Sequence, residues 1–440
     1  MKRRAARDGA RVRRVRLANG LTILLRELRQ EPIASIWCWY RVGSRDERPG
    51  LTGLSHWVEH MNFKGTRRVP KSQVTRRVEL AGGLWNGYTW LDVTTYFETV
   101  ESHALEEMIR LEASRMHECL YPQLEVERER TVVISELQGG ENDPRTFLDK
   151  EVSGMGLQAH PYRWPTIGYL SDLRAITRDD LYAHYRRFYV PNNAILVLVG
   201  DFATAEALRL VRRHFGKIPR GAPTPEIRTI EPPQEGERRV RLERPSGATY
   251  LQGSYHAPAA SDDDFPALLV ADAILAGPAT INVWASGRGR GPSKSSRLYR
   301  ALVEADLATD VGTTLVPTRH PFLYSVQATA KDGVDPGRIE TVLYAEIERL
   351  ARGDLTPADL ERARTQLHAR QALENESVTD IAHQLGFFET IARHDLPSLI
   401  ARRIDTVGAD AIARVAGTWL GERQRTVGIL RPSKSVEGGA

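Results

Sequence analysis

The stretch GLSHWVEH at residues 53–60 places two histidines and a glutamate within five consecutive positions. An α-helix advances about 100° per residue, so His56, Glu59 and His60 share one narrow face. Neutral imidazoles at i and i+4 can take two corners of a tetrahedral zinc site, and the carboxylate between them can accept a proton. The alternative to a zinc site is that the two histidines and the glutamate fall on one face of an amphipathic helix by chance. The hypothesis of a zinc site therefore needs a third ligand.

A glutamate-rich stretch, EVERERTVVISE at residues 125–136, offers that ligand. Taken alone, it is typical of a helix with a solvated, charged face. Glu129 and Glu136, however, are seven residues apart and fall two turns apart on one face. Val132 and Val133 predict that positions next to this face enter a core. We therefore expect Glu136 to point inward.

Further motifs follow the pentad through the first half of the chain. They are FKGT at 63–66, GG at 82–83, TTY at 94–96, HPY at 160–162, YVPNN at 189–193 and VGD at 199–201. The pentad itself has the order His-x-x-Glu-His, the inverzincin signature. With these motifs the chain resembles the family of pitrilysin, insulin-degrading enzyme and mitochondrial processing peptidase, as a short, bacterial-type catalytic subunit.

The resemblance implies a zinc metalloendopeptidase that hydrolyses unfolded peptides or oligopeptides inside a chamber. It implies one Zn²⁺ per chain, and in relatives the peptide adds as a strand to a sheet edge beside the zinc. The metal ligands would be His56, His60 and Glu136, the catalytic base Glu59, the supporting acidic residue Glu129, and the substrate-binding strand Asn86, Gly87, Tyr88 and Thr89.

Apolar runs and turn residues predict an α+β fold with two homologous α/β-roll halves. Each half would have a mixed or antiparallel sheet with helices packed on one face. A segment rich in Pro and Gly, 218–236, predicts a linker between a catalytic half, 1–217, and a second half, 237–440. Strands are predicted at 21–25, 34–42, 94–100, 194–199, 238–242, 249–255 and 426–430, and helices at 103–118, 177–188, 205–215, 265–275, 336–350 and 357–388.

The two halves differ in chemistry. The helix that corresponds to the pentad helix reads LLVADAIL at 268–275 and contains no histidine. Only the first half is therefore expected to hold the metal.

A second difference concerns stabilisation of the transition state. After SRLY at 296–299, relatives that work alone carry a Leu-Arg pair and then a Tyr, whereas this chain has Val303 and Thr309 at those positions. A site without such donors to the oxyanion would be slow. Either a homologous partner supplies them in a clam-shell dimer, with a heterodimer favoured over a homodimer, or Arg297, Tyr299 or another local group substitutes.

Two other functions stay open, namely a non-catalytic core or assembly subunit and a peptide-binding subunit with silent zinc. The inward-facing acidic pair beside two histidines argues against a purely structural role.

Composition limits the partners, the location and the cysteine chemistry that can be expected of this protein. The 440 residues have a net charge of +5, with no RNP, zinc-ribbon or helix-turn-helix signature, so no nucleic-acid partner is predicted. No apolar run could span a membrane, and no signal peptide is visible, so a cytoplasmic protein is expected, with periplasmic or organellar placement left open. Cys38 and Cys119 are too few for a thiolate zinc site, although one disulfide remains possible.

Overall fold

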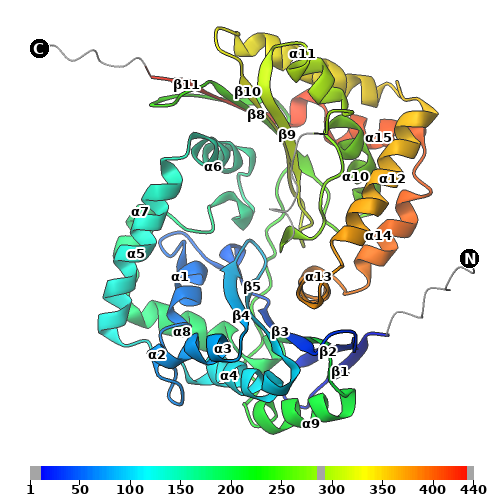
Figure 1. Ribbon diagram of the computed structural model, residues 1–440. Coiled ribbons are helices and arrows are strands. Elements are labelled where there is room, and N and C mark those ends of the chain that lie inside the picture. The colour runs from blue at the N-terminus through cyan, green and yellow to red at the C-terminus, as the bar shows by residue number, and fades with distance from the viewer. Residues whose placement is uncertain (1–10, 285–292, 434–440) are drawn as a thin grey trace, which may run out of the picture. The chain divides into compact units, whose positions relative to one another are not determined.

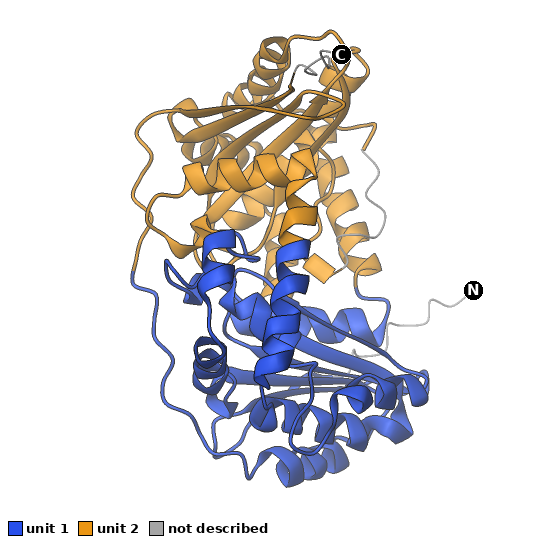
Figure 2. Cartoon of the chain, turned by 90° about the vertical axis from the view of Figure 1, so that its left-hand side faces the viewer, with its two compact units in different colours: residues 1–135, 165–228, 375–395 blue, residues 136–164, 229–374, 396–440 orange. Residues whose placement is uncertain are grey.

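The computed structural model describes residues 11–284 and 293–433, in two compact units (Figure 2). Unit 1 comprises residues 1–135, 165–228 and 375–395, and unit 2 comprises residues 136–164, 229–374 and 396–440. Each unit is built on one mixed sheet with packed helices, which confirms the predicted α+β class. None of the helices within the described residues combines the length and the apolar composition needed to cross a bilayer.

Unit 1 contains a six-stranded sheet (Figure 1). The strands follow the order β1, β2, β6, β3, β5, β4, in which β2 and β6 are parallel and the other neighbours antiparallel. The edges are therefore β1 and β4. The strands are β1 (Arg13–Arg16), β2 (Thr22–Glu27), β3 (Ile33–Tyr40), β4 (Leu84–Thr89), β5 (Thr94–Glu101) and β6 (Ala194–Gly200).

The helices of unit 1 come from three stretches of the chain. The first stretch ends inside α5, which runs on into unit 2. The helices are α1 (Leu54–Met61), α2 (Lys71–Val74), α3 (Arg76–Leu80), α4 (Leu105–Glu118), α5 (Gln123–Glu141), α7 (Leu170–Ala175), α8 (Arg178–Phe188), α9 (Thr204–Phe215) and α13 (Val378–Ile391).

Helices cover both faces of this sheet, so the prediction of helices on one face is wrong. The central strand β3, IASIWCWY, has no polar alternation and is buried along almost its whole length. Trp37 and Trp39 face α13, where each ring lies 5.1 Å from the His383 ring. The residue between them, Cys38, points to the opposite face, which α4 covers. Burial of both faces explains the continuous apolar run.

A glycine brings α13 close to the sheet. A Cβ on Gly386 would lie 1.9 Å from Nε1 of Trp39, so no larger residue fits without a shift. Hydrogen bonds flank this contact: the hydroxyls of Thr379 and Thr99 are 2.8 Å apart, and Arg14 Nε donates to Glu389 at 2.9 Å. Helix α13, which comes from the second half of the sequence, thus covers one face of the sheet formed by the first half.

Unit 2 contains a five-stranded sheet in the order β7, β11, β8, β10, β9. Here β7 and β11 are parallel and the remaining neighbours antiparallel. The order repeats that of β2, β6, β3, β5, β4 in unit 1, including the parallel first pair, as two copies of one fold require. The strands are β7 (Arg238–Arg244), β8 (Tyr250–Ala257), β9 (Ala308–Leu315), β10 (Phe322–Ala330) and β11 (Arg425–Pro432).

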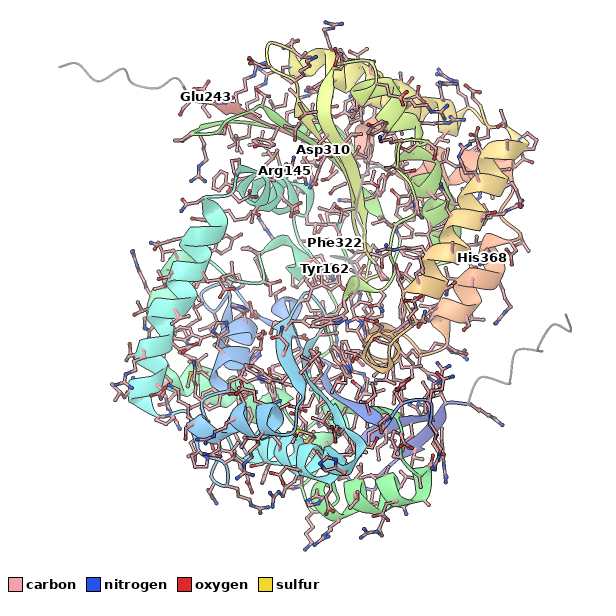
Figure 3. The ribbon with its side chains drawn as sticks, in the orientation of Figure 1. Arg145, Tyr162, Glu243, Asp310, Phe322 and His368 are labelled. Carbon is pink, nitrogen blue, oxygen red and sulfur yellow. The ribbon has the colours of Figure 1, made fainter. Side chains whose placement is uncertain are left out.

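The helices of unit 2 also lie on both faces of its sheet. On one face Asp149 of α6 accepts a hydrogen bond from Gln252 at 2.8 Å, and on the other Asp272 of α10 accepts one from Tyr324 at 3.0 Å. Arg145, at the start of α6, also contacts Asp310 at 3.3 Å (Figure 3). The helices are α6 (Pro144–Gly156), α10 (Phe265–Leu275), α11 (Pro336–Ala351), α12 (Pro357–Leu373), α14 (Leu396–Ile404) and α15 (Ala409–Trp419).

The single helix predicted over 357–388 is wrong, because the chain breaks it into α12 and α13. Ser377 caps the second helix, and its hydroxyl accepts a hydrogen bond from the backbone N–H of Asp380 at 3.0 Å. The Ser-x-x-Asp spacing is a helix-start signal that the apolar periodicity obscured. The break allows α12 to belong to unit 2 and α13 to unit 1.

The segment between α9 and β7 contains no helix or strand, consistent with its Pro and Gly content. It is nevertheless docked at both ends. Asn192 in unit 1 accepts a hydrogen bond from the Gly221 N–H at 2.7 Å, and Glu231 in unit 2 accepts bonds from three successive backbone N–H groups, 158–160. The predicted division at 217 and 236 follows the sequence repeat. The compact units differ from it, because residues 136–164 of the first half belong to unit 2 and residues 375–395 of the second half belong to unit 1.

The two cysteines lie in the core of unit 1, Cys38 in β3 and Cys119 just after α4. Both are buried and free, so no disulfide joins them. Burial raises the pKa of the Cys119 thiol to about 12, which keeps it protonated and unreactive at neutral pH.

Gly386→Ala is expected to lower the thermal unfolding midpoint. The added methyl would collide with Trp39, and overpacking of this kind costs about 1–3 kcal/mol. Gly417→Ala is the matched control, since Gly417 lies in α15 with nothing within 4 Å of an added methyl, and alanine favours a helix by up to ~1 kcal/mol. Scanning calorimetry measures both. Equal effects would contradict the close packing of α13.

Candidate metal centre

Helix α1 carries the pentad and is held firmly at its start. Its N-cap, Gly53, has φ +87°, and a Cβ there would lie 2.4 Å from the carbonyl oxygen of Ile167. The backbone N–H groups of Gly53 and Ser55 donate to the buried Glu47 carboxylate at 2.8 and 2.6 Å. These bonds satisfy donors that a helix start leaves unpaired, and a carboxylate suits the positive end of the helix dipole.

The other end of α1 is fixed by Asn62, whose side chain is fully buried. Its Nδ2 donates to the Tyr96 hydroxyl at 2.9 Å, and its Oδ1 accepts from the Tyr121 hydroxyl at 2.8 Å. Tyr121 has φ +53°, a left-handed conformation that is rare for a bulky residue. The pentad helix is thus pinned at both ends by buried polar groups.

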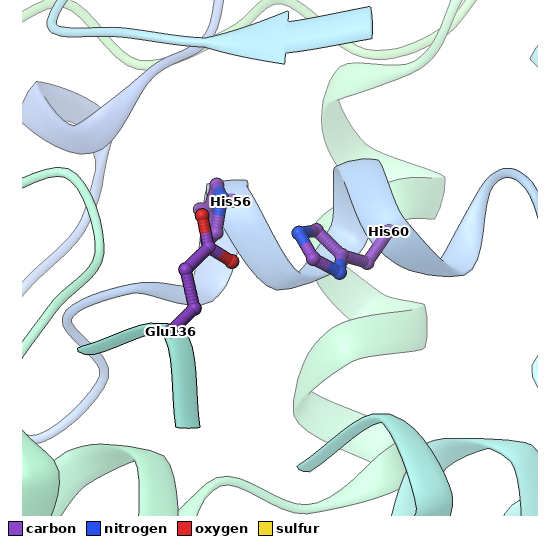
Figure 4. Close-up of side chains that lie close together, drawn as sticks. All are labelled: His56, His60 and Glu136. Atoms are coloured by element: carbon purple, nitrogen blue, oxygen red, sulfur yellow. The ribbon is translucent and has the colours of Figure 1, made fainter. Parts of the chain in front are cut away.

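His56, His60 and Glu136 come together beside α1. One ligand atom from each lies within 4.8 Å of the other two (Figure 4). The boundary between the compact units falls between Ser135 and Glu136, inside the unbroken helix α5. Donors around a tetrahedral zinc with bonds of about 2.1 Å are roughly 3.4 Å apart, so small side-chain adjustments would suffice. Within the described residues this is the one such group of His, Cys, Asp and Glu.

Glu129 fixes the tautomer of His60. Its Oε1 lies 2.9 Å from His60 Nδ1, and its Oε2 lies 2.6 Å from Lys64 Nζ. Burial opposes a charge on Glu129, but the hydrogen bonds from His60 and Lys64 outweigh it and lower the pKa of the carboxyl group. With its Nδ1 proton donated to a carboxylate, His60 presents the bare Nε2 for metal binding. Glu129 thus lies in contact with His60, and the supporting role implied by the family resemblance stays a prediction.

The His56 imidazole is suited to ligation because it is neutral. Burial, followed by the neighbouring His60 ring, lowers the pKa of His56 to about 3. The two rings lie 4.6 Å apart between centroids. Metal binding at His56 would therefore not compete with a proton near neutral pH.

Glu59, the middle residue of the motif, is buried and bonded to the neighbouring sheet. Its Oε2 accepts a hydrogen bond from the Thr89 hydroxyl of β4 at 2.9 Å. Thr89 itself lies opposite Thr94 at the start of β5. The bond fixes the position of this carboxylate oxygen.

The substrate strand predicted from the resemblance, Asn86 to Thr89, lies in β4 at the edge of the unit 1 sheet. Asn86 is exposed, and its side chain accepts from the backbone N–H of Gly87 at 2.9 Å. The other two side chains are engaged within the unit, Thr89 with Glu59 and Tyr88 with His383 of α13 at 2.7 Å. What β4 offers an incoming chain is its backbone edge and Asn86.

One sequence inference about α5 needs correction. Val133 is fully buried as expected, but Val132 is 49% exposed. The apolar stripe of α5 is therefore narrower than predicted, and Glu136 is an exposed residue whose carboxylate reaches the histidines. Adjacent positions of a helix point about 100° apart, so Val132 lies outside the buried stripe that contains Val133.

The positions that lack the expected donors lie in unit 2. Val303 ends a π-helical turn, Tyr299–Val303, and Thr309 lies in β9. Arg297, one suggested substitute, is largely buried and donates to the carbonyl of Asp354 at 2.6 Å and to Asp359 at 3.2 Å. Its guanidinium is therefore committed to the start of α12.

Several residues that build the site carry no local sequence signal. Glu47 precedes the pentad helix without any capping spacing, and Tyr121 and His383 reach the site from distant elements. Thr89 was among the residues of the expected substrate strand, but its contact with Glu59 requires the register of β4 on β5.

Comparisons with known proteins show the family of this chain. Residues 22–168 match the family described as insulinase (peptidase family M16), and residues 175–367 match the peptidase M16 inactive domain. The chain belongs to peptidase family M16. This confirms the family predicted from the motifs. The second match lies outside the pentad and includes residues 237–367 of the second half.

Two relatives are similar along almost the whole chain. Zinc protease PqqE of Helicobacter pylori is 26% identical over 429 residues, which covers 95% of this chain and 92% of the relative. A probable mitochondrial-processing peptidase subunit beta of Arabidopsis thaliana is 24% identical over 423 residues, covering 96% and 78%. M16 relatives of this chain are thus zinc proteases and peptidase subunits.

Solved structures share the fold. A protease from Helicobacter pylori superposes with a TM-score of 0.89 at 24% identity and covers 96% of this chain and 100% of that chain. The periplasmic protease PqqL of Escherichia coli gives 0.74 at 17% identity, covering 96% of this chain but 47% of that chain. This fold therefore occurs both in a chain of similar length and within a chain about twice as long.

Asn62→Ala is expected to lower the free energy of unfolding by about 2–3 kcal/mol, because the hydroxyls of Tyr96 and Tyr121 each lose their short hydrogen bond to Asn62 and keep only a contact of 3.4 Å. Asn86→Ala is the control, an exposed asparagine bonded only to its own chain neighbour, and should change stability by less than ~0.5 kcal/mol. Chemical denaturation followed by tyrosine and tryptophan fluorescence distinguishes them. A negligible effect of Asn62→Ala would refute its role in pinning α1.

Proposed function

We propose that this protein is a zinc-dependent endopeptidase subunit that hydrolyses unfolded peptides. The observation that carries the proposal is the meeting of His56, His60 and Glu136 within 4.8 Å beside the buried Glu59. Two neutral imidazoles and one carboxylate form the donor set of a hydrolytic zinc site, which keeps a fourth position for water. The relatives named zinc proteases support the same metal.

Each residue of the proposed site would have its own role in peptide hydrolysis. Zinc bound by His56, His60 and Glu136 would polarise the scissile carbonyl and lower the pKa of water beside it. Glu59 would take the proton from that water and pass it to the leaving amine. Thr89 holds one oxygen of Glu59, so the other faces a fixed direction. Glu129 keeps His60 in the ligating tautomer.

The edge of β4 is the proposed place for the peptide. An edge strand offers backbone N–H and C=O groups to an extended chain with little demand on its side chains. Asn86 is exposed at this edge, and Gly87 leaves the backbone uncovered by a side chain. A substrate held in this way must be unfolded, which favours peptides over folded proteins.

Glu59→Gln is expected to lower kcat by about 10²–10⁴-fold, because the general base is lost. The zinc content should remain one ion per chain, since all three ligands are intact. Quenched-peptide hydrolysis and metal analysis measure the two effects separately. His60→Gln is the comparison that should lose both. Full activity in Glu59→Gln would rule out the assigned base.

We further propose that a homologous subunit completes the site. Val303 and Thr309 offer no cationic or phenolic donor, and Arg297 is committed within unit 2. One relative is by name a subunit, and this chain spans about half the length of another protease. A heterodimer is favoured, in which the partner carries Arg and Tyr at the corresponding positions.

The lack of oxyanion donors at Val303 and Thr309 also favours a second candidate function. A subunit that binds peptide or supports assembly without turning over would need no oxyanion donors. The anchored Glu59 favours catalysis instead, since a silent site needs no positioned base.

The chain alone is expected to hydrolyse peptides slowly. Mixing it with a homologous chain that carries Arg and Tyr at positions aligned with Val303 and Thr309 should raise kcat/KM by about 10²–10³-fold, the effect of one oxyanion donor. The control is the same partner with its Arg replaced by Ala. Equal efficiency with and without a partner would exclude the heterodimer.

A further inference from the structure

A helix from the second half of the sequence is bonded directly to the proposed substrate strand. His383 of α13 and Tyr88 of β4 form a hydrogen bond of 2.7 Å between Nε2 and the phenol oxygen. Both residues belong to unit 1, although 295 positions separate them. The bond therefore links the metal-free half of the sequence to the strand beside the pentad.

The surroundings of His383 decide which of the two residues donates the hydrogen bond. Its ring is fully buried and lies against Trp37, Trp39 and Phe387, with centroids 5.1, 5.1 and 5.8 Å away. Burial lowers the pKa of His383 well below its usual value and raises that of Tyr88 well above. The imidazole is thus neutral and the phenol protonated. Tyr88 donates, and Nε2 accepts where water does not compete.

Strand β4 needs such support because it has one strand neighbour. Only β5 pairs with it in the described sheet, and Gly87 weakens the strand from within. Successive side chains point to opposite faces. Tyr88 therefore binds α13 on one face, while Thr89 binds Glu59 of α1 on the other.

We propose that His383 is a positioning residue that holds β4 through Tyr88, and thereby sets the line along which a peptide pairs beside the pentad. The proposal rests on the proposed function of β4 as the substrate strand. A shift at Tyr88 would also move Thr89, the next residue, away from Glu59. His383 touches neither peptide nor metal.

Peptide affinity tests the proposal without turnover. In a Glu59→Gln background, Tyr88→Phe removes the hydrogen bond and keeps the ring. The dissociation constant of a fluorescent unfolded peptide, measured by anisotropy, should rise about fivefold, the effect of one lost hydrogen bond. In the active chain the change should fall on KM, with zinc content unchanged. An unchanged dissociation constant would overturn the proposal.

Thr379→Val is the matched control. It removes a hydrogen bond of 2.8 Å between α13 and the same sheet, but at Thr99 of β5. It should cost comparable stability and leave peptide affinity unchanged. A loss of affinity equal to that of Tyr88→Phe would mean that α13 acts only through general stability, and would overturn the proposal.

Two substitutions at His383 complete the test. His383→Gln retains an acceptor near the position of Nε2 and should leave peptide affinity close to that of the unsubstituted chain. His383→Leu removes the acceptor and should raise the dissociation constant as much as Tyr88→Phe does. The double variant with Tyr88→Phe and His383→Leu should lose no more than either change alone. If the native chain neither binds zinc nor cleaves peptides, the proposed function fails. If it does both and these variants bind peptide normally, only the role of His383 fails.

Discussion

Burial of both faces of β3 is the constraint on which unit 1 depends. A strand with tryptophans on one side and cysteine, isoleucine and tyrosine on the other cannot face water on either side. Helix α4 covers one face, and α13 has to return from the second half to cover the other. Removing that cover would expose Trp37 and Trp39 together. The integrity of the first half is therefore a property of the whole chain.

The pentad helix shows how the scaffold serves chemistry. Glu47 and Asn62 immobilise the two ends of α1, so its three functional side chains keep a fixed relation to each other. Flexibility is left to groups outside the helix, since Glu136 is exposed and comes from α5. In the proposed site, two rigid ligands and one adjustable ligand would allow an ion to enter before the third ligand binds it.

Local patterns in the sequence predicted much of this architecture. The pentad helix, the strands β2, β3, β5 and β6, and the family followed from spacing and motifs, because these depend on neighbours along the chain. Strand β1 was not predicted, and β4 was expected only from the family resemblance. The repeat of the sheet topology was also visible as two similar series of elements. The α12–α13 break was missed because the apolar periodicity continues across Ser377.

Long-range contacts could not be predicted in the same way. The bond between Tyr88 and His383 depends on the return of α13, and the bond between Thr89 and Glu59 depends on the register of β4. Helices on both sides of each sheet contradicted a simple two-layer prediction, since no local signal states which sheet a helix will cover. Tertiary pairing, rather than propensity, decides these positions.

The return of α13 also has a consequence for biosynthesis. Residues 37 and 39 leave the ribosome more than three hundred positions before residues 378–391, a delay of roughly 20–70 s at 5–20 residues per second. During that interval an aromatic sheet face has no covering helix from its own chain. Contacts of such high sequence separation slow folding. In a nascent chain of this protein, the face that carries Trp37 and Trp39 therefore waits for its covering helix until synthesis is nearly complete.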